Sequence, residues 1–254
     1  EFDGLNLTWE TLEGLVKHNG PLTDASGKGL KGPVPQAIRD YSELHDLELD
    51  RFAGIEAQCA AIADDIAYNT HDIDDGLRAG LLTLDMLQGV GLPGSILRGV
   101  RAKYPHLDDV RTGHELMRRQ ITLMVEDVIA STTANIDRLK PDSADAVRAA
   151  GETLVTFSAD MAAAEKELKA FLYKHLYRHP EVMRVRADAE RIVRELFDVY
   201  FADPRAMPDG WREGLDRAEN RIKARSVADF LAGMTDTYAL KEHRRLFDHT
   251  PDLS

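Results

Sequence analysis

Apolar residues recur at spacings of three and four positions along most of the chain from residue 35 onward. This spacing places them on one side of an α-helix, so it predicts a succession of amphipathic helices. Alternation of apolar and polar residues with a period of two, which marks half-buried strands, is almost absent. The pattern therefore predicts an all-α fold, a multi-helix bundle.

The extent of each helix follows from the same pattern and from the residues that begin or end helices. Thr8 suits the start of one helix, Asp142 or Ser143 the start of another, and Pro180 a first helical turn. Gly and Pro concentrate in residues 17–35, which predicts a loop there. We expect helices over residues 8–18, 55–82, 107–139, 142–177, 180–203 and 226–248.

Composition narrows the class of protein. The 254 residues are 43% hydrophobic and 30% charged, as in ordinary globular proteins, and the formal net charge of −12 gives no support for nucleic-acid binding. The single cysteine, Cys59, excludes an internal disulfide within these residues and fits a reducing compartment; its Ala and Ile neighbours predict a core position. No apolar run approaches the roughly 20 residues of a membrane span, and no signal peptide is visible, so we expect a cytoplasmic protein that does not contact membranes.

One predicted helix, residues 55–82, carries acidic residues along one side. On an ideal helix the residues of this side fall within an arc of roughly 100°: they are Asp64, Tyr68, His71, Asp72 and Asp75. Such a face is either a solvated surface or a site, because carboxylates and a histidine on one face can bind a divalent cation. Two observations favour a site: Asp64 has Ala and Ile neighbours that predict a buried environment, and Arg78 is the one cation close by in sequence.

Four blocks of sequence, in this order, resemble a known family: LNLTWETLEGLVKHNGP at residues 5–21, ADDIAYNTHDIDDGLRAG at 63–80, FLYKHLYRHPEV at 171–182 and DFLAGMTDTYALKEHRRLFD at 229–248. They are similar to the bacterial deoxyguanosinetriphosphate triphosphohydrolases of the HD-domain phosphohydrolase superfamily. The resemblance implies an HD-domain-like helical bundle. It also implies metal-dependent hydrolysis of dGTP or other dNTPs to the deoxynucleoside and tripolyphosphate.

The resemblance assigns roles to particular residues. It implies that Asp64 is a metal ligand, with Mg²⁺ or Mn²⁺ as the expected cofactor. Tyr68 and Asp72, in the pattern Asp-x-x-x-Tyr-x-x-x-Asp, are expected to face the bound dNTP. Tyr177 and His179 match the element that lines the sugar and phosphate region in relatives.

The family's other ligands, a histidine and a His-Asp pair, precede the LNLT block in relatives. We therefore expect residues 1–254 to lack them, to contain no catalytic residue, and to be inactive as they stand. A single all-helical unit is expected, with residues 1–95 as the remainder of the HD core and 96–254 as a C-terminal helical part. The alternative is a non-catalytic nucleotide-binding or oligomerisation module. Relatives form oligomers, so we also expect a homo-oligomer, with residues 107–137 as an interface.

Some polar residues are interpreted as structural. Lys166, Lys169 and Lys174 suit a solvated helix face, although lysines there are also able to contact phosphates. His18 and Asn19 precede a Gly-Pro pair and suit a helix end.

Overall fold

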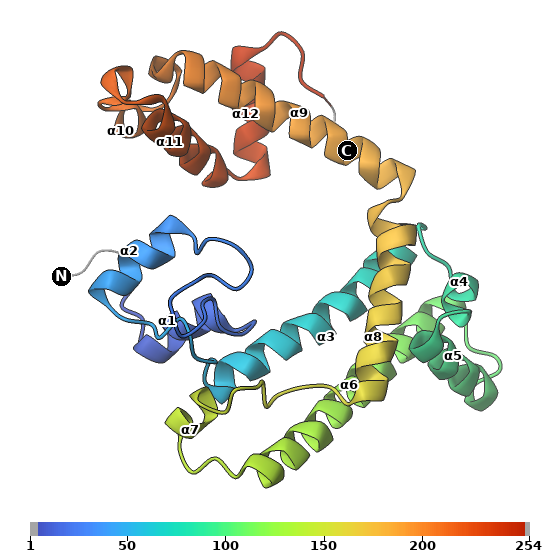
Figure 1. Ribbon diagram of the computed structural model, residues 1–254. Helices are drawn as coiled ribbons and strands as arrows, with labels where there is room; N and C mark the ends of the chain where they lie inside the picture. Colours follow the sequence, from blue (N-terminus) through green and yellow to red (C-terminus); the bar gives the residue numbers. More distant parts are fainter. Residues whose placement is uncertain (1–4, 252–254) are drawn as a thin grey trace. The chain divides into compact units, whose positions relative to one another are not determined.

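The computed structural model describes residues 5–251, and most of the backbone within them is helical (Figure 1). No strand occurs in this part of the chain, where the β-type contact is an isolated bridge between Thr23 and Gly29. The predicted all-α fold is therefore confirmed. Within the same range, no helix combines the length and apolar composition that a membrane span requires.

The chain divides into two compact units, the first ending at Leu176 and the second beginning at Tyr177. The sequence predicted one helical unit with a subdivision near residue 95. The subdivision near residue 95 was predicted from the family resemblance. The division into compact units does not test that boundary, so it stays a prediction.

The first unit contains eight of the α-helices of the described residues. They are α1 (Trp9–Lys17), α2 (Gln36–Leu44), α3 (Ile55–Arg78), α4 (Leu84–Gln88), α5 (Gly91–Lys103), α6 (Asp109–Leu139), α7 (Ala144–Arg148) and α8 (Ala159–Leu172). A π-helical turn, Tyr173–Tyr177, follows α8.

Helix α3 lies at the centre of this unit and packs against α1, α6 and α8 (Figure 1). Ile66 of α3 forms an apolar core with Met124 and Val128 of α6 and with Val155. The buried side chain of Gln58 ties the segment before α8 to α3, because its Oε1 accepts hydrogen bonds from the backbone N–H groups of Leu154 and Val155 at 2.8 and 3.1 Å. These contacts fix α3 on three sides.

The second unit is built on α9 (Pro180–Ala202), which packs against α11 (Asn220–Ala232) and α12 (Asp236–Leu246). Its remaining elements are α10 (Asp209–Arg212) and the short 3₁₀ turns Pro204–Ala206 and Leu215–Arg217. Two polar contacts join α9 to α12. The buried Tyr200 hydroxyl donates a hydrogen bond to Glu242 at 2.9 Å, and His243 Nε2 lies 2.7 Å from Glu195 Oε2.

Two predicted helices are wrong in extent. The expected helix over 142–177 is interrupted after α7, where Gly151 takes a positive φ of 74°, and Ser158 caps the new helix α8. The expected helix over 226–248 is two helices, because Thr235 accepts a hydrogen bond from the Tyr238 N–H at 3.2 Å and so begins α12. In both cases a local side-chain cap outweighs the apolar periodicity. The helices predicted from Thr8 and Pro180 begin where expected.

Candidate functional site

Helix α3 presents the predicted acidic side to solvent. Asp64 and Tyr68 are exposed, Tyr68 with 57% of its surface accessible, and Asp72 is half-buried. Ile66 and Ile73 are buried on the other side of the helix, so α3 is amphipathic. These residues sit where their helical spacing places them, while their functional roles stay predictions.

Two expectations about α3 are wrong. Asp64 is exposed and does not lie in a buried environment. Cys59, expected in the core, is also exposed. Ala and Ile neighbours in sequence do not bury these side chains, because the small residues around them line open clefts.

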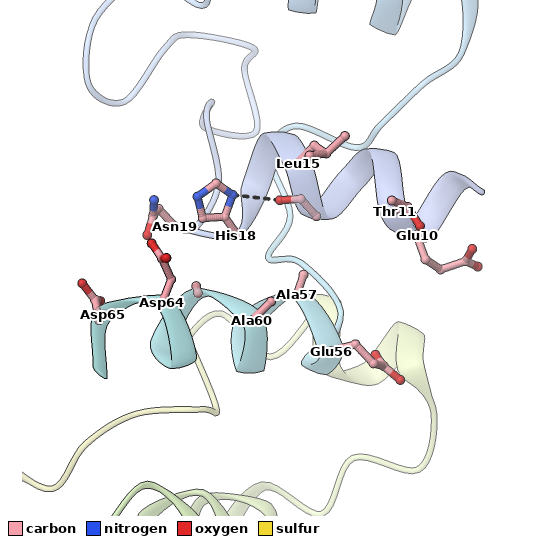
Figure 2. A pocket seen from close by; sticks show the side chains of 12 residues that line it. Glu10, Thr11, Leu15, His18, Asn19, Glu56, Ala57, Ala60, Asp64 and Asp65 are labelled. Carbon is pink, nitrogen blue, oxygen red and sulfur yellow. Dashed lines mark hydrogen bonds between the residues drawn. The ribbon is translucent and has the colours of Figure 1, made fainter. Parts of the chain in front are cut away.

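A cleft of about 520 Å³ separates α3 from α1; we call it the α1–α3 cleft (Figure 2). Asp64 and Asp65 line it from α3, and His18 and Asn19 line it from the end of α1. The helices approach closely at its apolar base, where a Cβ on Gly14 would lie 3.1 Å from the Cβ of Ala57. The cleft therefore has small apolar residues at its base and polar groups along its rim.

His18 is held in a defined orientation in this cleft. Its Nδ1 lies 2.9 Å from the carbonyl oxygen of Gly14, so Nδ1 carries the proton and donates to that acceptor (Figure 2). This arrangement leaves Nε2 with a lone pair in the neutral ring. His18 is the C-cap residue of α1, as the sequence indicated, yet it also lines the site.

Negative charge dominates the α1–α3 cleft. Its lining includes the carboxylates of Glu10, Glu56, Asp64 and Asp65, whereas His18 is its one basic residue. The side chain of Asp64 makes no hydrogen bond or ion pair with any other residue between 5 and 251. Figure 2 shows the Asp64 carboxylate and the Asn19 side chain turned toward each other. Like charges gathered in one cleft favour binding of a cation.

The described residues do not form a complete metal site by themselves. Within residues 5–251, no group of three or more His, Cys, Asp and Glu side chains is placed to hold a metal ion. A carboxylate such as that of Asp64 suits Mg²⁺ or Mn²⁺ as one ligand, but these ions need several oxygen ligands. Asp64 thus fits the role of a single ligand in a larger set.

Lys169 joins α8 to the acidic side of α3. Its Nζ lies 2.9 Å from Asp65 Oδ1 and also contacts Glu165, whose other partner is the Asn69 amide at 3.1 Å. Partial burial by itself would lower the pKa of Lys169, but the contacts with Glu165 and Asp65 raise it above its ordinary value. Lys169 was interpreted as part of a solvated face, and its side chain is exposed as expected, while its two ion pairs also place it beside the acidic side of α3.

A second cleft adjoins the first and shares His18 and Asn19 with it. This loop cleft has a volume of about 300 Å³ and lies against the loop of residues 20–35, and its lining includes the charged side chain of Lys31. In the described part of the chain Lys31 forms no ion pair, so its charge is available to a ligand. The loop is ordered by Asp24, whose Oδ1 accepts hydrogen bonds from the N–H groups of Ser26 and Lys28 at 2.9 and 3.0 Å.

A buried ionic network fixes α1 against the start of α3. Glu13 and Lys17 are 1% and 0% exposed, with Lys17 Nζ 3.0 Å from Glu13 Oε2, and the Gly54 N–H donates to Glu13 at 3.1 Å. Burial would raise the pKa of Glu13, but hydrogen bonds from Arg148 and Lys17 outweigh it and hold this pKa below the ordinary value. The network holds the end of α1, and with it His18, opposite α3.

Tyr177 and His179 belong to the second unit. Tyr177 ends the π-helical turn, and His179 caps α9 by accepting from the Glu181 N–H at 3.4 Å. π-Helical turns are rare and occur frequently at functional sites. The expected contact of these residues with sugar and phosphate stays a prediction.

Sequence reasoning missed His18, Asn19 and Lys31 as site residues. No periodic pattern connects them to Asp64: the packing of α1 on α3 brings His18 and Asn19 to the cleft with Asp64, and Lys31 lines the adjoining loop cleft. The resemblance block at residues 5–21 contained His18 and Asn19, and this was the available signal.

The chain is similar to one known protein domain and, over its whole length, to several named proteins. A model of the phosphohydrolase-associated domain matches residues 155–245. The whole chain is 89% identical to "Deoxyguanosinetriphosphate triphosphohydrolase-like protein 1" of Mesorhizobium japonicum. It is 58% identical to the deoxyguanosinetriphosphate triphosphohydrolase-like proteins of Allorhizobium ampelinum and Rhizobium johnstonii. The chain spans 63% of the length of each of these relatives.

Proposed function

Since the chain is similar over its whole length to deoxyguanosinetriphosphate triphosphohydrolase-like proteins, we propose that it forms the nucleotide-binding body of a dNTP triphosphohydrolase. The matched phosphohydrolase-associated domain supports a phosphohydrolase function. The observation that carries the proposal is the α1–α3 cleft, in which the unpaired carboxylate of Asp64 lies opposite His18 and Asn19.

The proposed reaction converts a dNTP and water into a deoxynucleoside and inorganic tripolyphosphate. The water oxygen bonds to the α-phosphorus, the bond from this phosphorus to the 5′ oxygen breaks, and the 5′ oxygen takes up a proton. A bound divalent ion would polarise the α-phosphoryl oxygens. Asp64 would be one ligand of that ion, and the remaining ligands would come from outside the described residues.

The residues of this chain bind and orient the substrate in this proposal. Tyr68 is exposed one helical turn after Asp64, and Asp72 follows after another turn. The Tyr68 hydroxyl is able to donate a hydrogen bond to a phosphate oxygen, and the Asp72 carboxylate is able to accept one from a deoxyribose hydroxyl. Fixing the substrate in this way is a positioning role, which accelerates a reaction by ordering the reacting groups in advance.

Lys31 supports the assignment of a phosphate-containing ligand. Tripolyphosphate is strongly anionic, whereas the α1–α3 cleft is lined by carboxylates. The adjoining loop cleft supplies the positive charge of Lys31 and meets the first cleft at His18 and Asn19. One ligand is therefore able to place a metal-bound part near Asp64 and an anionic part near Lys31.

A second candidate function is nucleotide binding without catalysis. The observation that favours it is that residues 5–251 supply one ligand for a metal and no cluster of three. Association of several copies of the chain also stays a proposal, and the mass of the full-length protein in solution measures it.

The experiment that tests the proposed function is incubation of the full-length protein with each dNTP and Mg²⁺ or Mn²⁺. Equal amounts of deoxynucleoside and tripolyphosphate are expected. Release of pyrophosphate or orthophosphate would contradict the proposed bond cleavage. Binding of dNTP without any product would favour the second candidate.

A further inference from the structure

An apolar groove of about 360 Å³ lies between α3 and α6, with Val155 at its base. We call it the α3–α6 groove. Apart from Cys59 and His71, every residue that lines it is aliphatic. The groove continues into the apolar core, because Ile66 and Val128 line it and also belong to the core cluster with Met124. It is therefore an opening onto the core of the first unit.

Helix α6 contributes a stripe of large aliphatic residues to this groove. Ile121, Val125 and Ile129 follow one another at four-residue spacing and are 38%, 40% and 61% exposed. Side chains at this spacing lie on one face of a helix. A contiguous exposed apolar surface of this kind marks an interaction site more often than scattered single residues do.

Helix α3 contributes small residues at the same spacing. Cys59, Ala63 and Ala67 line the opposite wall of the groove. Small side chains on one wall and branched ones on the other leave a channel into which the side chains of another helix fit. The shape and composition of the groove thus suit the apolar face of an amphipathic helix.

The lengths of the relatives indicate where that helix comes from. The relative from Mesorhizobium japonicum is 89% identical over all 254 residues, yet these residues span 63% of its length. More than a third of that protein therefore lies outside the region compared. We propose that an amphipathic helix from this outside part packs in the α3–α6 groove and completes the apolar core of the first unit.

Cys59 provides a direct reporter of this packing, because it is the single cysteine of the chain and is exposed in the groove wall. The full-length protein is treated with iodoacetamide in its native state and in urea, and labelling of Cys59 is followed by peptide mass spectrometry. The proposal predicts that native labelling is roughly tenfold or more slower than labelling of the unfolded protein. Native labelling at nearly the unfolded rate would overturn it.

Two matched substitutions on α6 distinguish a change inside the groove from a change at any exposed apolar residue. Val125 and Leu123 are 40% and 41% exposed, but Val125 lines the groove and Leu123 does not. Val125→Asp is expected to speed native labelling of Cys59 about fivefold or more, whereas Leu123→Asp leaves it unchanged. If Val125→Asp prevents folding, Val125→Ala is used instead, and it is expected to increase the native labelling rate of Cys59 by a smaller factor. Equal effects of the Val125 and Leu123 substitutions would contradict the proposal.

A second copy of the chain is the alternative occupant. Labelling over a range of protein concentrations distinguishes the two, because packing within one chain does not depend on concentration. Protection of Cys59 that disappears when the protein dissociates into monomers would overturn the proposal in favour of a subunit interface. Protection that persists in the monomer supports it.

Discussion

Arg148 donates hydrogen bonds from Nε and Nη2 to the same oxygen of Glu13, at 2.9 and 2.7 Å, although 135 positions separate the two residues in sequence. The guanidinium also lies over the ring of Trp9, 4.8 Å from its centre. This contact joins α1 to the end of α7 and closes the buried network with Lys17 and Gly54. The orientation of α1 against α3, and hence the α1–α3 cleft, depends on it.

Replacing Glu13 with Gln is expected to lower the free energy of unfolding of the first unit. The substitution leaves Lys17 buried without its counter-charge, and breaking a buried ion pair costs about 3 kcal/mol. Urea unfolding followed by Trp9 fluorescence measures the change, in a Trp211→Phe background that removes the other tryptophan. Glu10→Gln, on the exposed side of the same helix, is the control and should be nearly neutral. A Glu13→Gln protein as stable as the control would contradict a stabilising network.

The same network predicts a dependence of stability on pH. The pKa of Glu13 lies below its ordinary value of 4.5 in the folded protein, so the unfolded chain binds the proton more tightly. The stabilisation from Glu13 is therefore present above about pH 4.5 and is lost as the pH falls through its lower folded-state pKa. The difference in unfolding free energy between the parent and Glu13→Gln should shrink as the pH decreases below this value. A difference that is constant down to acid pH would exclude the ionised carboxylate as its source.

Lys31→Ala is expected to weaken binding of dNTPs and of inorganic tripolyphosphate about tenfold, because the loop cleft loses its lysine charge. Affinity for the deoxynucleoside, which carries no phosphate, should not change. Lys28→Ala is a matched control, since Lys28 is exposed on the same loop but does not line the cleft. Dissociation constants from calorimetry measure both effects. If both variants lose the same affinity for dNTPs and tripolyphosphate, the loss reflects the total charge of the protein, and Lys31 does not bind the phosphates specifically.

Tyr68→Phe keeps the aromatic ring and removes the hydroxyl. We expect kcat/KM for dNTP hydrolysis to fall about tenfold or more, because the hydroxyl is proposed to orient the substrate. Folding should be unaffected, since Tyr68 is 57% exposed. Steady-state kinetics measure the ratio, with Tyr104→Phe as a control at an exposed tyrosine that is not on α3 but follows α5. An unchanged kcat/KM would mean that the hydroxyl makes no important contact in the transition state.

The sequence predicted those features that depend on local spacing. The acidic side of α3 follows from helical periodicity, and the starts of α1 and α9 follow from Thr8 and Pro180. The break at Gly151 was missed, because the alanine-rich residues 144–150 before it have a high helix propensity and apolar residues continue after it.

Features that depend on packing between distant segments were not predictable in this way. His18 and Lys31 take their places in the clefts because the Glu13 network holds α1 against α3 and Asp24 orders the loop. The exposure of Asp64 and Cys59 depends on which helices cover α3. The residues next to Asp64 and Cys59 in sequence do not indicate which helices pack on α3.

The Asp64→Ala variant of the full-length protein tests whether Asp64 binds the metal of the proposed dNTP triphosphohydrolase. The variant should fold normally, because Asp64 is exposed and its side chain forms no hydrogen bond or ion pair with other residues between 5 and 251. Its rate of tripolyphosphate release with Mg²⁺ or Mn²⁺ is expected to fall about 100-fold or more, with a matching loss of metal affinity. Asp75→Ala, at another exposed carboxylate of α3, should keep both properties. Parental turnover and metal affinity in Asp64→Ala would contradict the assignment of Asp64 as a metal ligand.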